Sequence, residues 1–160
     1  MLSTRMRDFR QLRDWAKAHN LALEIYRTTH HFPKEELYGL TNQLRRAAAS
    51  IPANIAEGFG RGGNAEIARF LQIGMGSAYE VEYHALLARD LGFLKEETYN
   101  RLSSQIIEVK RMLATLIHKV RSGCYFPAVY CSLFTVYPIG RVIVTTSPSF
   151  GALSAAIVPP

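Results

Sequence analysis

Residues 43–61, QLRRAAASIPANIAEGFGR, constrain the fold most strongly because they carry two helical faces at once. At about 100° per residue, the apolar side chains fall on one stripe, which is typical of a helix face packed into a core. That stripe continues upstream and comprises Leu37, Leu40, Leu44, Ala48, Ile51, Ile55 and Phe59. A second, polar stripe comprises Arg46, Ser50, Asn54, Glu57 and Arg61. A polar line in an alanine-rich segment needs a partner, whether protein, ligand or nucleic acid.

The same helical periodicity occurs four times between the N-terminus and residue 122. Apolar side chains recur at spacings of three and four over about residues 12–29, 34–59, 64–91 and 95–121. Pro33, the glycines of residues 58–63 and Gly92 separate these segments, and Asn64 is the expected N-cap of the third. Four amphipathic helices with short connections predict an all-α, antiparallel up-down four-helix bundle, which we place at residues 1–123 as one domain.

The periodicity also predicts which side chains enter the core. In the first helix, Trp15 and Tyr26 share the expected core spacing with Leu12, Ala16, Ala22 and Leu23. The third helix contains small residues at Gly74, Gly76, Ser77 and Ala78, where another helix backbone can approach closely. Ala47, Ala48 and Ala49 of the second helix would fit against them.

Residues 124–160 differ from the rest of the chain and are expected to form a non-helical, poorly ordered tail. They contain one charged residue, Arg141, and five prolines, and the helical period is absent. Pro127 and Pro138 also argue against a transmembrane helix. The tail is open to three interpretations: a partner-binding segment, a wrap over the bundle, or sequence foreign to the domain, such as read-through past an ancestral stop. We favour the third, because composition and periodicity change together.

The chain is basic, with a formal net charge of +6 and an isoelectric point near 9.5. Such a protein can meet nucleic acid, an anionic membrane surface or an acidic protein. No RNA- or DNA-binding motif is present, so binding would be mainly to phosphates; aromatic stacking platforms are not evident, since Trp15 has core spacing. The alternative for each basic cluster is a solvated surface. The candidate nucleic-acid-binding residues are Arg5, Arg7, Arg10, Arg13, Lys17, Arg45, Lys110, Arg111, Lys119 and Arg121, with Arg45 expected to be more exposed than Arg46.

The polar stripe of the second helix has a counterpart on the third. Arg69, Ser77, Glu80 and His84 share one face there. We expect Arg46 to pair with Glu80, and Glu57 to pair with Arg61 or Arg69. The favoured interpretation is a structural network or interface, within one protomer or between protomers, and the alternative is a surface that grips a ligand.

Nothing in the sequence favours an enzyme. Glu57 and Glu80 are two carboxylates on adjacent helices, but neither is followed by the His at i+3 that carboxylate-bridged metal bundles use. No serine or cysteine lies in a nucleophile motif, and GFGRGG at residues 58–63 lacks the lysine of a phosphate-binding loop. Cys124 and Cys131 form neither a disulfide framework nor a zinc site. We therefore expect no catalytic residues, no metal and no cofactor.

Several stretches resemble the four-helix-bundle family named after the 23S rRNA intervening-sequence protein. They are FRQLRDW at 9–15, FPKEELYGL at 32–40, QLRRAAASIPANIAEG at 43–58 and RFLQIGMGSAYEVE at 69–82. A weaker likeness extends to the accessory variability proteins of diversity-generating retroelements. The resemblance implies a small cytosolic bacterial protein that forms a homopentameric ring without catalytic activity. It also implies RNA or DNA as a partner, and a reverse transcriptase or another protein as a further one. The tail departs from the family pattern.

Two hypotheses for the function follow. The first is a non-enzymatic, oligomeric accessory protein that binds nucleic acid through basic surface. The second is a protein-interaction or assembly scaffold that binds no nucleic acid. The charged N-terminal sequence lacks a secretory signal, so the expected location is the cytoplasm with no membrane association.

Overall fold

The computed structural model describes residues 8–61 and 63–123. These residues form helices and turns, with no strand among them. The α-helices are α1 (Arg13–Thr28), α2 (Leu40–Arg61), α3 (Asn64–Asp90) and α4 (Glu96–Arg121). Three short 3₁₀-helices accompany them: η1 (Phe9–Gln11), η2 (Thr29–His31) and η3 (Lys34–Leu37). The predicted tail at 124–160 lies outside the described residues, as do Arg5 and Arg7.

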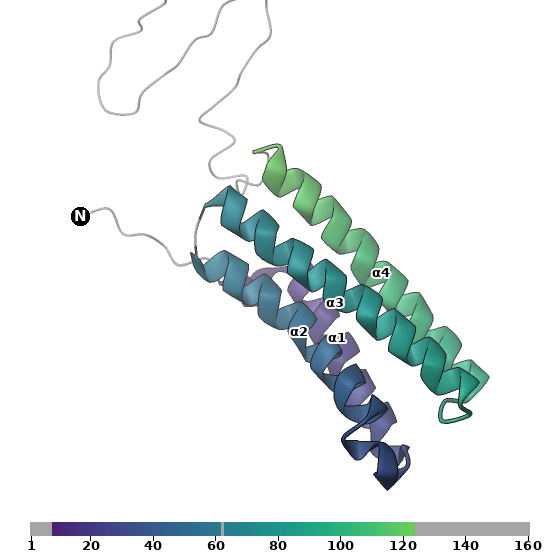
Figure 1. Ribbon diagram of the computed structural model, residues 1–160. Coiled ribbons are helices and arrows are strands. Elements are labelled where there is room, and N and C mark those ends of the chain that lie inside the picture. The colour runs from purple at the N-terminus through teal and green to yellow at the C-terminus, as the bar shows by residue number, and fades with distance from the viewer. Residues whose placement is uncertain (1–7, 62, 124–160) are drawn as a thin grey trace, which may run out of the picture. The chain divides into compact units, whose positions relative to one another are not determined.

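Each α-helix packs against two others, as Figure 1 shows. Helix α1 contacts α2 and α4, and α3 contacts the same two helices. The register makes neighbours antiparallel: Ser50 of α2 meets Ser77 of α3, whereas Gly58 farther along α2 meets Ile67 near the start of α3. The predicted all-α four-helix bundle is therefore confirmed. No helix in the described part of the chain is long and apolar enough to cross a membrane.

The core of α2 follows the predicted stripe except at its first member. The side chains from Leu40 to Phe59 on that stripe are buried, but Leu37 is 46% exposed. The chain forms the 3₁₀-helix η3 and turns at Tyr38 and Gly39 before α2 begins. The Glu36 carboxylate accepts a hydrogen bond from the Leu40 N–H at 3.0 Å. That local cap starts a new helix, so the expected single helix from residue 34 is wrong.

Helix α1 buries Ala22 as predicted, but the rest of its buried face differs from the predicted one. Its buried residues are Ala18, Leu21, Ala22 and Ile25, whereas Leu23 and Tyr26 are 40% and 46% exposed. Apolar and aromatic side chains occur on two overlapping stripes of this helix. The prediction from periodicity took the stripe that carries the larger side chains. Packing against both α2 and α4 selects the other one.

The α2–α3 connection is tighter than the glycine-rich sequence predicted. Gly58 and Gly60 lie inside α2, which extends to Arg61. Gly63, with φ 77°, precedes α3, and no side chain caps that helix, so the prediction of Asn64 as N-cap is wrong. A Cβ on Gly58 would stand 2.9 Å from the Cβ of Phe70 and 3.4 Å from the Cα of Ile67. Gly58 is therefore a close-packing residue.

Candidate functional site

The middle of the polar stripe joins α2 to α3 within one chain. The hydroxyl oxygens of Ser50 and Ser77 lie 2.8 Å apart. The Asn54 amide donates to the Ser50 carbonyl at 2.8 Å and to its hydroxyl at 2.9 Å. Ser77 also donates to the carbonyl of Ile73 at 3.2 Å. These bonds satisfy polar groups in the helix seam, so this part of the stripe already has a partner inside the protomer.

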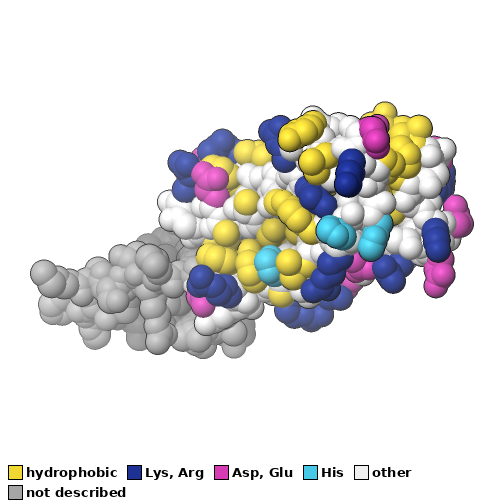
Figure 2. Space-filling model, turned by 90° about the horizontal axis from the view of Figure 1, so that it is seen from below, with side chains coloured by type: hydrophobic (Ala, Val, Ile, Leu, Met, Phe, Trp, Pro, Cys, Tyr) yellow, Lys and Arg dark blue, Asp and Glu magenta, His cyan; other side chains and the backbone are white. Residues whose placement is uncertain are grey.

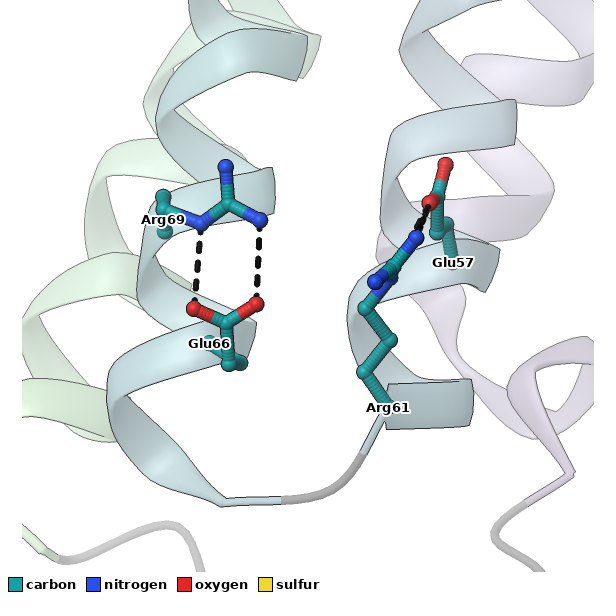
Figure 3. A network of polar contacts seen from close by, with 4 residues as sticks. All are labelled: Glu57, Arg61, Glu66 and Arg69. Carbon is teal, nitrogen blue, oxygen red and sulfur yellow. Dashed lines mark hydrogen bonds and ion pairs between the residues drawn. The ribbon is translucent and has the colours of Figure 1, made fainter.

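Two ion pairs flank the turn between α2 and α3, as Figure 3 shows. Arg61 binds Glu57 at 2.6 Å, which is one of the expected pairs. Arg69 binds Glu66 with two hydrogen bonds of 3.0 Å, and the hydrogen bond from Arg69 lowers the pKa of the Glu66 carboxyl. Both guanidinium groups also lie over the ring of Phe70, at 5.0 and 4.4 Å. These side chains stabilise the turn and are not free for a ligand.

The expected pair between Arg46 and Glu80 is absent from the ion pairs of the described residues. Glu80 instead lies 3.6 Å from the Nε2 of His84. Residues four positions apart differ by about 40° around a helix. Arg46 therefore faces solvent, whereas Asn54, eight residues later on the same stripe, lies closer to α3. Arg46 and Glu80 line a shallow groove of about 430 Å³ over the small side chains of α2.

Arg45 is half-buried, contrary to the expectation that it is the exposed member of the Arg45–Arg46 pair. Its Nε donates to the Thr29 hydroxyl at 2.7 Å, and a terminal nitrogen donates to the Tyr26 carbonyl at 3.5 Å. Its guanidinium also lies 5.2 Å from the centre of the Tyr26 ring. A cation at a helix C-terminus is favoured by the helix dipole, so Arg45 holds the end of α1.

Three further predicted phosphate-binding residues are paired with carboxylates. Lys17 lies 2.8 Å from Glu108, and Arg10 lies 3.6 Å from Asp8. Lys110 lies 2.6 Å from Glu82 and 4.1 Å from the centre of the Tyr79 ring. A phosphate at these positions would compete with a carboxylate that is already bound.

Four predicted cations have no ion pair among the residues that the structure describes. They are Arg13, Arg111, Lys119 and Arg121, and we call them the free cation set. Arg13 begins α1, and the other three lie on the C-terminal half of α4. Because α1 and α4 are antiparallel neighbours, Arg13 and Lys119 both lie near the carboxyl of Asp14, and the positive charge of each favours a lower pKa of that carboxyl. Burial raises the pKa of Asp14, and the two cations oppose that rise.

Trp15, which the sequence predicted to lie in the core, belongs instead to an aromatic cluster at the edge of the bundle. The rings of Trp15 and His19 stack at 4.9 Å with an angle of 8° between their planes. Phe9 meets Trp15 edge-on at 5.1 Å, and Arg10 lies 4.9 Å from the centre of the Phe9 ring. All three rings are partly exposed. Figure 2 shows histidine and basic side chains interspersed with hydrophobic ones on one face of the bundle.

The carboxylates and histidines of the described residues are not gathered into a metal site, because no three His, Cys, Asp or Glu side chains lie together in a suitable arrangement. Glu57 and Glu80, the two carboxylates considered for acid–base chemistry, have separate partners in Arg61 and His84.

Comparisons with known proteins agree with this architecture. The model of a family described as 23S rRNA-intervening sequence protein matches residues 10–115. The crystal structure of a protein of unknown function, assigned to the S23 ribosomal protein family of Bacteroides thetaiotaomicron VPI-5482, is similar with a TM-score of 0.59. The two chains are 23% identical, and the match covers 65% of this chain and 97% of the other. At that identity the similarity supports the fold alone. No curated protein matches the chain.

Proposed function

Because this chain belongs to the 23S rRNA-intervening sequence protein family, we propose that it is a non-enzymatic, oligomeric accessory protein that binds RNA or DNA phosphates through its basic surface. The observation that carries the proposal is the free cation set. Most other cations considered as phosphate ligands have an internal partner, whereas these four have no ion pair among the described residues and lie at the start of α1 and on the C-terminal half of α4. Nucleic-acid phosphates are the abundant polyanions that such a surface would attract.

Self-association would multiply a modest charge. Four cations in one protomer give weak binding, but copies held in a ring contact one strand at several points and gain avidity. The outward face of α3 supports a second copy as partner: Ile73, Tyr79 and Tyr83 are 45%, 56% and 58% exposed. Gly76 lies among them with no atom within 4 Å of an added Cβ. An exposed apolar face of this kind can pack against the shallow groove lined by Arg46 and Glu80 in the next copy, and such head-to-tail contacts can close rings.

The test compares two variants of the full chain that carry the same change in charge. The first replaces the free cation set by glutamine (R13Q, R111Q, K119Q, R121Q). The matched control replaces four paired arginines (R61Q, R69Q, R89Q, R101Q), whose partners are Glu57, Glu66, Asp90 and Glu24. Both variants are checked for helicity, and their affinity for a structured RNA is measured by fluorescence anisotropy over a range of salt concentrations.

We expect wild-type affinity to fall steeply with salt, with a slope of about −0.7 to −0.9 per neutralised phosphate. The free-cation variant should bind more weakly with a shallower slope, and the control should retain most of the wild-type slope. Equal losses in the two variants would mean that only net charge matters and would contradict the assigned surface. No binding by wild type at low salt would refute the proposal.

The second candidate function is an assembly scaffold that binds no nucleic acid. The exposed face of α3, with Ile73, Tyr79 and Tyr83, is the observation that favours it. A packed apolar interface should be little affected by salt. Persistent self-association, together with no RNA binding at any salt concentration, would support this alternative.

A further inference from the structure

A histidine lies among the unpaired cations of α4. Residues 109–121 of this helix include four lysine and arginine side chains and no acidic residue. His118 belongs to the same segment, although the sequence did not single it out as a candidate nucleic-acid-binding residue. Its side chain is exposed, and it has no ion pair among the described residues.

The ion pairs of α4 with its neighbours show which way His118 faces. Glu108 pairs with a lysine of α1, and Lys110 pairs with a glutamate of α3, so these two residues mark the sides of α4 that face α1 and α3. At about 100° per residue, His118 falls midway between those two sides on the outer face of the helix. Arg111 lies within about 20° of it and about 10 Å away along the helix axis.

The other free cations of α4 lie on either side of His118. Lys119 is on the α1 side, where it and Arg13 lie near the carboxyl of Asp14. Arg121 is on the α3 side, where it lines a hollow beside the first two turns of α3. His118 and Arg111 therefore lie at the centre of the basic surface, and the free cation set surrounds the histidine.

The carboxylates near this part of α4 have other partners. The charged groups that face it from the neighbouring helices are Arg13, Asp14 and Lys17 on α1 and Glu66 and Arg69 on α3. Glu66 binds Arg69, and Glu108 of α4 itself binds Lys17. Asp14 is partly buried beside two cations. In the described part of the chain, no carboxylate is therefore paired with His118.

A phosphate would supply the anion that His118 lacks. A histidine side chain ordinarily gains its second proton near pH 6.5, and the protonated ring has two N–H donors. An anion bound beside the ring favours the protonated form. Because such coupling is reciprocal, the protonated form also binds the anion more tightly.

We propose that His118 is a phosphate contact at the centre of the basic surface, and that its imidazole takes up a proton from solvent when nucleic acid binds. This inference rests on the proposed nucleic-acid binding and adds its regulation by pH. In mildly acidic solution His118 adds a fifth cation to the free cation set, so binding strengthens as the pH falls through the range in which histidine titrates.

The test measures the affinity of the full chain for a labelled RNA hairpin at about pH 5.5 and about pH 8. Fluorescence anisotropy is recorded over a range of salt concentrations at each pH. We expect wild type to bind at least about threefold more tightly at the lower pH, with a salt slope steeper by about 0.7–0.9. Calorimetry in two buffers of different ionisation enthalpy counts the protons taken up on binding.

Two variants and one control make the test specific. His118→Gln should lose the gain at low pH and take up fewer protons, whereas His118→Lys should bind at the higher pH about as tightly as wild type does at the lower one. His31→Gln removes an exposed histidine far from α4 in the chain and should keep the whole pH dependence. Neutralisation of Asp14 also strengthens binding at low pH, so His118→Gln is the deciding comparison.

The outcomes separate this inference from the proposed function. Tight binding with the same affinity at both pH values would overturn the role of His118 and leave phosphate binding intact. The same gain at low pH in His118→Gln as in wild type would also overturn it. If the hairpin does not bind at low salt at either pH, both the proposed function and this inference fail.

Discussion

At the scale of single residues, the glycines of α2 differ in ways that their spacing does not reveal. Gly58 faces α3, where an added Cβ would collide with the Cβ of Phe70. Gly60 lies in the same helix with no atom within 4 Å of an added Cβ. One glycine is therefore required by the close approach of two helices, and the other carries only the entropic disadvantage of glycine in a helix.

We predict opposite effects of alanine at these two positions. Gly58→Ala should lower the free energy of unfolding by about 1–3 kcal/mol, because α2 and α3 must separate to admit the methyl group. Gly60→Ala should raise it by up to about 1 kcal/mol through helix propensity. Urea denaturation followed by circular dichroism measures both. Equal effects would mean that α2 and α3 do not approach as closely at Gly58 as described.

Arg45 and Arg46 give a second comparison of adjacent residues. Arg45→Gln should cost about 1–2 kcal/mol, since it removes charged hydrogen bonds at the end of α1. Arg46→Gln should change stability by less than about 0.5 kcal/mol, because Arg46 is exposed and has no ion pair among the described residues. Denaturant titrations of the two variants provide the measurement. A larger loss of stability for Arg46→Gln than for Arg45→Gln would contradict this assignment and favour the expectation from sequence that Arg45 is the more exposed of the two.

At the scale of elements, the first turn of α1 should respond to pH through Asp14. Burial raises the pKa of this carboxyl in the folded state, so the folded chain holds the proton more tightly than the unfolded chain. The resulting stability is fully present below the ordinary pKa of about 3.9 and is lost as pH rises through the raised folded value.

Asp14→Asn removes this ionisation and should be at least as stable as wild type at neutral pH. The stability of wild type relative to the variant should improve as the pH falls into the acid range. Denaturant titrations of both proteins at neutral and mildly acidic pH test the sign. A wild-type advantage that grows as pH rises would show instead that the carboxylate is stabilised by Arg13 and Lys119 more than it is penalised by burial.

At the scale of the whole molecule, the outward face of α3 should decide self-association. Gly76→Ala adds a methyl group in open space, which favours the isolated helix by up to about 1 kcal/mol. If a second copy packs closely over Gly76, the same methyl group should weaken assembly. We therefore predict a more stable fold with a smaller assembly, measured by denaturation and by native mass spectrometry. An unchanged assembly would place the contact elsewhere.

The candidate site was only partly predictable from sequence. The Glu57–Arg61 pair followed from i,i+4 spacing because both residues lie on one helix. The pairing of Arg46 with Glu80 failed because it depended on how α2 and α3 rotate against each other. The roles of Arg45, Lys17 and Lys110 were missed for the same reason, since their partners come from other elements.

The sequence by itself determined the class of the fold. Four amphipathic segments, separated by proline and glycine, can bury their apolar stripes only against one another, and local periodicity is enough to identify the stripes of α2, α3 and α4. Tertiary structure alone decided which face of α1 is buried, because that helix carries two apolar stripes and the choice depends on its neighbours. It also decided which cations remain unpaired and placed Trp15 at the edge, since ion pairs and exposure depend on distances between residues far apart in the chain.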